Sequence, residues 1–280
     1  GEVEEGIGRW RGHGRGLGSA SPVRSVGEVV GLTLPGVASI TAADSHHSRM
    51  ASYSGRRIVE MVWEDLKPSD ILDAKAFDNA ITTVHALSGS TNALIHLIAM
   101  AGRANVKLAL ERFDELSRLT PVLANVRPAG DKYLMEDFYY AGGLRGLLGE
   151  LRGLLNLDCM TVNGKTLGDN LKDAKVYNSD VIRPLDNPLA KSGGLTVLRG
   201  NLAPDGAVIK PTAAEARLMK HTGRAVVFTN YEDMSAHIDY ENPYIDKHCL
   251  LSLQKRRPPC GPGMPRTGTL RLPKTRPAQG

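Results

Sequence analysis

Residues 181–207 are interrupted at short intervals by turn-forming residues, which favours short extended segments over long helices. The run comprises Val181-Ile182-Arg183-Pro184-Leu185-Asp186-Asn187-Pro188 and Gly193-Gly194-Leu195-Thr196-Val197-Leu198-Arg199-Gly200-Asn201-Leu202-Ala203-Pro204-Asp205-Gly206-Ala207. Beyond residue 157, β-like segments alternate with turn dipeptides, at 160–162, 195–198, 207–209 and 225–228. This pattern predicts a β-rich second part, with a domain boundary near residue 156.

Helical periodicity dominates the part before this boundary. In residues 42–66 apolar side chains recur every four residues, which predicts an amphipathic helix that ends before Pro68. Its apolar positions are Ile58, Val62 and Leu66, with Val59 and Trp63 beside them. Asp73 is suited to cap a second helix, in which Phe77, Ile81 and Val84 share one face.

Further segments follow the same reasoning. A third helix is predicted through Leu94, Leu97, Ile98 and Ala101, and a short one around Phe113 and Leu116 that stops at Pro121. Residues 122–126 form an apolar run of strand length, and the leucine stripe between 144 and 155 is expected to pack in a core. Asn230 is a suitable cap for a helix over 231–238.

Composition narrows the class of protein. The chain has 280 residues, 41% hydrophobic and 5% aromatic, with a net charge of +5. Residues 251–280 hold seven Lys or Arg and no acidic residue, so the remaining chain has 28 basic and 30 acidic residues. The basicity therefore belongs to a Pro-rich tail, and a nucleic-acid-binding face is not expected. A salt-sensitive contact of this tail with nucleic acid or acidic membrane is kept as a third hypothesis.

Cysteines and hydropathy predict a cytoplasmic protein. Cys159, Cys249 and Cys260 are too few and too irregularly spaced for a secreted disulfide framework. The sequence contains no apolar run of membrane-spanning length and no signal-peptide pattern at residues 1–18.

The strongest candidate for a ligand site is the loop Ser88, Gly89, Ser90, Thr91 and Asn92, which precedes a predicted helix. Backbone amides and small hydroxyls at a helix N-terminus can hold a carboxylate or phosphate. The alternative is an ordinary helix cap made by Ser90 or Thr91.

Other motifs favour structural roles. Asn163-Gly164-Lys165-Thr166 resembles the end of a phosphate-binding P-loop, but Cys159 stands where that loop needs glycine, so a turn ahead of a helix is expected. The histidines at 46, 47, 85 and 96 do not form a zinc-protease pattern, so no metal-binding residues are assigned. Ser88-Gly89-Ser90 also lacks the glycine spacing of a hydrolase nucleophile.

The run at 181–207 resembles the dehydratase family that contains dihydroxy-acid dehydratase, phosphogluconate dehydratase and the sugar-acid dehydratases. The resemblance covers roughly residues 18–239. Its other segments are Leu34-Pro35-Gly36, Gly55-Arg56-Arg57-Ile58-Val59-Glu60, Thr120-Pro121-Val122-Leu123-Ala124-Asn125 and Met135 through Gly143. Residues 92–104 and 136–143 look most like the arabinonate and xylonate branch.

The resemblance implies a fold and a chemistry. The expected fold class is α/β, with a helix-rich part of the family's cluster-binding domain followed by part of a β-barrel-like domain. Family members remove water from 2,3-dihydroxy acids and give 2-keto acids through an enol, using an iron-sulfur cluster and a magnesium-type cation. It also implies that the loop 88–92 faces the active site, that a sugar acid or dihydroxy acid is the small-molecule partner, and that a homo-oligomer is compatible with the family.

Several family positions are not matched. The resemblance places a third cluster cysteine where this chain has Gly14, and two others upstream of the corresponding region. Gly261-Pro262-Gly263-Met264-Pro265 resembles a segment followed by a metal-binding glutamate, but the next residue here is Arg266. A guanidinium would repel a divalent cation. The family's catalytic serine lies beyond position 280, so no catalytic residue is assigned.

Two hypotheses follow from these matches and mismatches. The first is an inactive part of a dehydratase, laid out as a disordered lead (1–25), a partial α/β domain (26–155), a partial barrel-like domain (156–250) and a basic tail (251–280). The residues at both ends that depart from the family pattern are expected to result either from frame errors in the coding sequence or from a genuine truncation. The second hypothesis is a non-catalytic binding or subunit-interaction protein that retains an anion site at Ser88–Asn92.

Overall fold

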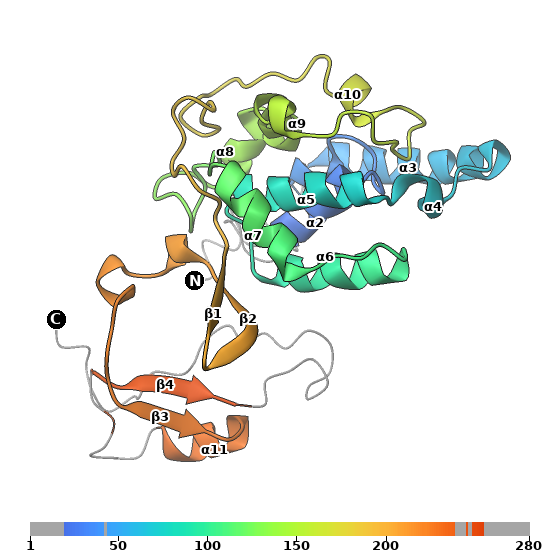
Figure 1. Ribbon diagram of the computed structural model, residues 1–280. Helices are drawn as coiled ribbons and strands as arrows, with labels where there is room; N and C mark the ends of the chain where they lie inside the picture. Colours follow the sequence, from blue (N-terminus) through green and yellow to red (C-terminus); the bar gives the residue numbers. More distant parts are fainter. Residues whose placement is uncertain (1–19, 42–43, 239–244, 246–247, 255–280) are drawn as a thin grey trace. The chain divides into compact units, whose positions relative to one another are not determined.

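The computed structural model describes residues 20–41, 44–238, 245 and 248–254. By their internal contacts the residues divide into two compact units, 1–214 and 215–280. The first unit is mainly helical (Figure 1). Its helices are α2 (Ala20–Val29), α3 (Ser45–Glu64), α4 (Pro68–Ile71), α5 (Ala74–Ala86), α6 (Asn92–Arg103), α7 (Leu110–Leu119), α8 (Met135–Tyr140), α9 (Gly143–Glu150) and α10 (Leu167–Asn170), with short 3₁₀ turns η1 (Val37–Ser39) and η2 (Arg152–Leu154).

Helix α5 is the centre of the first unit and packs against α2, α6 and α7 (Figure 1). The Asp73 carboxylate accepts a hydrogen bond from the Ala76 amide, as the predicted cap requires. Phe77, Ile81 and Val84 are at most 1% exposed, which confirms their shared buried face. Burying an aromatic side chain such as Phe77 contributes about 2 to 3 kcal/mol to folding.

The remaining helix predictions are largely confirmed. Leu94, Leu97 and Ala101 of α6 and Phe113 and Leu116 of α7 are all buried. The leucine stripe predicted between 144 and 155 lies in α9 and the turn after it, where Leu144, Leu147, Leu148 and Leu151 join the main hydrophobic core. Leu155 is partly buried against this core, whereas Leu154 is 39% exposed, so the expected core packing does not extend to Leu154.

Helix α2 begins within the segment expected to be a disordered lead. Residues 20–25 form its first turns, because Val26, Val29 and Val30 at its other end are buried against the core. The Glu28 carboxylate of α2 accepts hydrogen bonds from the Gly36 and Ala38 amides at 2.7 and 2.8 Å and so holds the loop of Leu34-Pro35-Gly36. The rest of the predicted lead lies outside the described residues.

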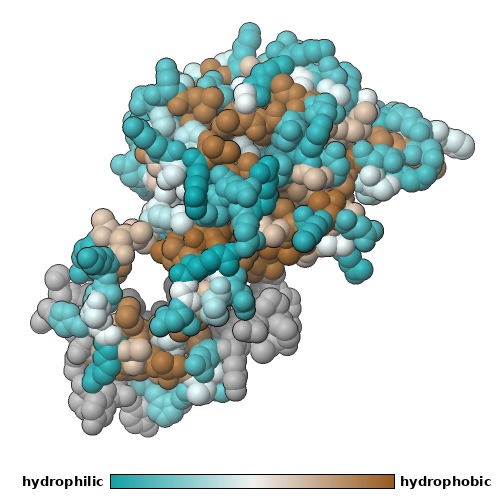
Figure 2. All heavy atoms as spheres, in the orientation of Figure 1, coloured by the Kyte–Doolittle hydropathy of each residue, from teal (hydrophilic) through white to brown (hydrophobic). Residues whose placement is uncertain are grey.

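The amphipathic helix predicted over 42–66 is present as α3, but its apolar face does not point into the core. Val62 is 71% and Trp63 85% exposed, whereas Arg57 and Met61 are buried. On the face that Figure 2 shows, hydrophilic residues cover much of the first unit, with hydrophobic patches between them. Sequence periodicity predicted the helix, and the residues that it buries are Arg57 and Met61.

Strands in the first unit are few. β1 (Thr196–Gly200) and β2 (Ala203–Ile209) form an antiparallel pair in which Thr196 lies opposite Ile209, with an irregularity between Leu198 and Gly200. Val197 and Val208 pack on the main core, and η3 (Pro211–Ala213) follows. The apolar run at 122–126 makes only isolated bridges, because its partners at residues 133, 182 and 190 belong to loops.

The second unit is a small β-α-β arrangement. η4 (Ala216–Leu218) precedes β3 (Ala225–Phe228), α11 (Tyr231–His237) and β4 (Leu250–Leu253), and the two strands are parallel. The Asn230 side chain accepts a hydrogen bond from the Asp233 amide, which confirms the predicted cap. Phe228, Met234, Ile238 and Ile245 form its core.

The expected fold class is confirmed: a helix-rich part precedes small β-sheets. The division into compact units falls at 214/215, and strands β1 and β2 of the first unit include Val197 and Val208, which pack on its hydrophobic core. The domain boundary near residue 156 stays a prediction. Of the helices in the described ranges, none combines the length and the apolar character that crossing a membrane requires.

Candidate functional site

The candidate loop Ser88–Asn92 begins as the C-terminal cap of α5. The Ser88 amide donates to the His85 carbonyl at 3.0 Å and the Gly89 amide to the Val84 carbonyl at 2.8 Å. These two bonds form a Schellman motif, in which the residue after the C-cap adopts a left-handed conformation. Ser88 has φ +48° and is fully buried. A serine at this position is strained by about 1 kcal/mol relative to glycine.

Gly193 and Gly194 pack directly against this turn. A Cβ atom on Gly194 would lie 2.3 Å from the Ser88 Cα and Oγ atoms, and one on Gly193 would lie 2.8 Å from the His85 ring. The Gly194 amide also donates to the His85 carbonyl. Because Gly193 and Gly194 have no side chains, their backbone can lie directly against the backbone of the Ser88 turn at the base of the candidate site.

Lys210 and Thr212 complete the surroundings of Ser88, although neither residue was predicted to belong to the site. The Lys210 Nζ atom donates to the Ser88 carbonyl at 2.5 Å, and the Ser88 and Thr212 hydroxyls are 2.8 Å apart. Burial lowers the pKa of Lys210, and within the described ranges no carboxylate pairs with its ammonium group. The signal in the sequence was a lysine directly after the predicted strand at 207–209.

The second half of the loop forms the start of α6. The Ser90 Oγ atom accepts a hydrogen bond from the Asn92 amide at 3.2 Å, while the N-cap residue Thr91 makes no capping bond through its side chain. Thr91 is exposed and Ser90 and Asn92 are partly buried. Ser90 thus has the capping role of the alternative interpretation, and Thr91 presents its hydroxyl to solvent. Ligand binding by the loop remains a prediction.

His85 lies beneath the loop as a neutral, structural histidine. It is 1% exposed, its Nε2 atom is 2.9 Å from the Phe113 carbonyl, and burial lowers its pKa to about 4. Its Nδ1 atom has no hydrogen-bond partner within the described part of the chain. A ring this enclosed does not reach a ligand and is a packing residue, as expected for the histidines.

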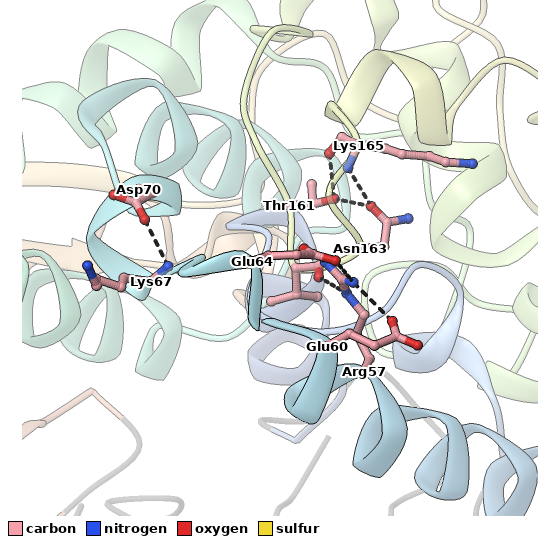
Figure 3. Close-up of polar contacts among 9 residues, drawn as sticks. Arg57, Glu60, Glu64, Lys67, Asp70, Thr161, Asn163 and Lys165 are labelled. Carbon is pink, nitrogen blue, oxygen red and sulfur yellow. Dashed lines mark hydrogen bonds and ion pairs between the residues drawn. The ribbon is translucent and has the colours of Figure 1, made fainter. Parts of the chain in front are cut away.

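The segment 163–166 is a turn, as predicted. Gly164 has φ +74°, Met160 and Thr166 form a bridge around it, and Thr166 caps α10. Figure 3 shows that Arg57 of α3 reaches toward this turn, where its Nε atom donates to the Val162 carbonyl at 2.6 Å. The turn anchors α3 through this bond.

The residues described do not fit an iron-sulfur cluster or a divalent metal. No group of three His, Cys, Asp or Glu side chains in the described ranges is arranged to hold an ion. Burial raises the pKa of the Cys159 thiol to about 11, which disfavours the thiolate that a cluster requires. Cys249 belongs to the other compact unit. Gly14, Cys260 and Arg266 lie outside the described residues.

Comparison with known proteins identifies relatives for nearly the whole chain. The N-terminal model of the dihydroxy-acid/6-phosphogluconate dehydratases matches residues 1–170, and the C-terminal model matches residues 180–280. An L-arabinonate dehydratase of Rhizobium leguminosarum bv. trifolii is 48% identical over 88% of this chain and 43% of its own length. A dihydroxy-acid dehydratase of Caldicellulosiruptor bescii is 45% identical over 89% of this chain and 45% of its own length. A 6-deoxy-6-sulfo-D-gluconate dehydratase of Pseudomonas putida is 43% identical over 98% of this chain and 48% of its own length.

The chain spans about half the length of the curated relatives it matches. Both family models cover it almost without interruption, on either side of residues 171–179. The chain therefore belongs to the dihydroxy-acid/6-phosphogluconate dehydratase family.

Proposed function

We propose that this chain is part of a hydro-lyase that dehydrates a 2,3-dihydroxy acid, either a sugar acid or a branched-chain precursor, to a 2-keto acid. The observation that carries the proposal is the match to both the N-terminal and the C-terminal family models. The relatives are named for arabinonate, dihydroxy acids and a sulfogluconate. These compounds share a carboxylate, for which a site with positive charge and hydroxyl donors is suited.

The residues around Ser88 support a role in binding this carboxylate. Lys210 supplies a partly buried ammonium group without an acidic partner among the described residues, and Thr91 supplies an exposed hydroxyl at the start of a twelve-residue helix. A cation in a desolvated position and a helix N-terminus both favour an anion. In the proposal these groups bind and orient the acid, and they do not take part in bond breaking.

We further infer that this chain alone does not turn over its ligand. Removing the proton next to the carboxylate needs a base, and the departing hydroxide needs a Lewis acid to take up its charge. At positions 14 and 266 the chain carries Gly and Arg where the resemblance implies a cluster cysteine and a metal-binding glutamate. A cytoplasmic setting belongs to the same proposal, because the chain has only three cysteines.

The alternative function is a non-catalytic protein that binds an anion at Ser88–Asn92. The position of Lys210 favours this second candidate as strongly as the first, because binding requires neither the cluster nor the metal. In the first candidate the complete dehydratase provides the cluster and the metal. In the second candidate neither group is needed.

The test is an assay of the purified chain after addition of iron, sulfide and magnesium. L-arabinonate and a branched-chain 2,3-dihydroxy acid are the substrates, and the 2-keto acid is measured. We expect no product from this chain and product from a full-length relative treated in the same way. Product formation by this chain would overturn the inference of inactivity.

A further inference from the structure

We propose that a hollow between α4 and the C-terminal end of α6 binds an aliphatic monocarboxylate, whose alkyl chain lies on apolar side chains and whose carboxylate pairs with Arg103. The loop Ser88–Asn92 leads into the other end of α6, about 17 Å away along the helix. The proposal therefore concerns a second site and does not depend on the proposed function.

The hollow has a volume of about 520 Å³, and the side chains that line it come from three stretches of the first compact unit. These are Leu32 after α2, residues within 68–72 in and after α4, and residues within 99–105 at the end of α6. Figure 1 shows α4 and this end of α6 on the same side of the helical unit. Sites for small molecules commonly have volumes of roughly 300 to 1,000 Å³, so the hollow is large enough for a small organic ligand.

The wall of the hollow is apolar. Leu32, Leu72, Met100 and Ala104 are partly buried and pack on the main hydrophobic core, and each of them also lines the hollow. The core therefore holds these side chains in place, while part of their surface remains in contact with solvent. An alkyl chain that covers this surface gains affinity by roughly threefold for each methylene group that it buries.

Arg103 supplies a positive charge beside the apolar wall. It is the last residue of α6, its side chain is exposed, and it pairs with no carboxylate in the described ranges. None of the residues that line the hollow is acidic. The side chains of Ser69 and Asn105 also line the hollow and form no hydrogen bond with the part of the chain that the structure describes. A carboxylate in the hollow therefore meets one cation and two hydrogen-bond donors.

The end of α6 is closed by its own backbone and does not need the Arg103 guanidinium. The Val106 amide donates to the Ala101 carbonyl at 2.8 Å, and the Asn105 amide donates to the Gly102 carbonyl at 3.3 Å. With Asn105 at φ +56°, these bonds form a Schellman motif. Because the backbone satisfies these two carbonyls, Arg103 is available to a ligand.

The apolar wall and the single cation together select one class of ligand. A sugar acid would place its hydroxyl groups against apolar side chains, where they lose hydration without gaining hydrogen-bond partners. An alkylamine would place its ammonium group beside Arg103, and an uncharged alkane would gain nothing from the guanidinium. An alkyl chain that ends in one carboxylate uses both the wall and Arg103.

The test is equilibrium dialysis of the full chain with radiolabelled octanoate, for which we expect a Kd on the order of 0.1 millimolar. Arg103→Gln is expected to weaken binding at least tenfold, because the ion pair is lost. Ala99→Glu places a carboxylate at the edge of the hollow and is expected to weaken binding as strongly. Both positions are exposed and both new residues are good helix formers, so folding is preserved.

The matched control is Arg56→Gln, which removes the same charge from an exposed position of α3 and should leave the Kd unchanged. Octylammonium and acetate should each bind at least tenfold more weakly than octanoate, and L-arabinonate should not displace octanoate. Absence of octanoate binding at about 5 millimolar, roughly fifty times the expected Kd, overturns the proposal. Binding that is insensitive to Arg103→Gln or Ala99→Glu, equal weakening by Arg56→Gln, equal affinity for octylammonium, or displacement by L-arabinonate overturns it as well.

Discussion

Acidification should destabilise the chain through the buried ring of His85. The ring is 1% exposed, and burial lowers its pKa from 6.5 to about 4. The unfolded chain therefore binds a proton below pH 6.5 that the folded chain does not accept until about pH 4. The free energy of unfolding then falls by about 2.5 kcal/mol between about pH 7.5 and 4.5 through this residue.

Glu28 contributes the opposite sign in the same pH range. Burial raises the pKa of its carboxyl from 4.5 to about 7, so the folded state takes up a proton before the unfolded state does. Its contribution to stability is present at low pH and is lost as the pH rises from 4.5 toward 7. The two contributions nearly cancel in the wild type, each being on the order of 2.5 kcal/mol.

The assay is urea denaturation at about pH 7.5 and 4.5 for the wild type, His85→Gln and Glu28→Gln. Relative to the wild type, His85→Gln should gain about 2.5 kcal/mol on acidification, and Glu28→Gln should lose a similar amount. Gly102→Ala, a change at an open position that carries no titratable group, serves as the control and should follow the wild type. Parallel pH dependences of the wild type and His85→Gln would refute the reasoning.

Two further predictions concern the backbone at the candidate site. Gly194→Ala should destabilise the chain by more than about 2 kcal/mol, because its Cβ atom would lie 2.3 Å from the Ser88 Cα atom. Gly153→Ala, with open space around it, should change the urea midpoint little, and equal effects of the two variants would contradict the packing argument. Ser88→Ala should be less stable than Ser88→Gly by about 1 kcal/mol in thermal unfolding, because only glycine adopts φ +48° without strain. Equal melting temperatures would argue against strain at this turn.

Local signals in the sequence predicted the helices well. Asp73 and Asn230 cap the helices that follow them, and Phe113 and Leu116 are buried one turn apart, as their spacing indicated. These features depend on residues within a few positions of one another, so a single sequence contains what determines them.

Features that depend on distant residues could not be predicted in the same way. The inward side of α3 is decided by the bond from Arg57 to the Val162 carbonyl, 105 positions away in the sequence. The run at 122–126 has the composition of a strand, but its bridging partners lie in loops. Apolar periodicity indicates that one face of a helix is apolar, but it does not indicate which residues cover that face.

The candidate site could be predicted only in part, because some of its contacts join residues that are distant in the sequence. The loop Ser88–Asn92 could be found because it joins two helices that the sequence shows clearly. Lys210 and Thr212 contact Ser88 from 122 and 124 positions away in the sequence, so nothing in the local sequence assigned them to the loop. Gly193 and Gly194 were noticed as turn residues, whereas their close approach to His85 and Ser88 is a property of the fold.

The central claim, that this chain binds the carboxylate of a sugar acid at the Ser88 loop without converting it, is tested most directly by calorimetric titration with L-arabinonate, with the 2-keto acid assayed afterwards. The account predicts binding by the wild type and no product, with affinity weakened at least tenfold by Lys210→Met or Thr91→Ala and unchanged by Lys165→Met, which alters an exposed lysine outside the loop. It also predicts no binding of the uncharged sugar L-arabinose. Equal binding of arabinose and arabinonate, binding insensitive to Lys210 and Thr91, or formation of the 2-keto acid would contradict it.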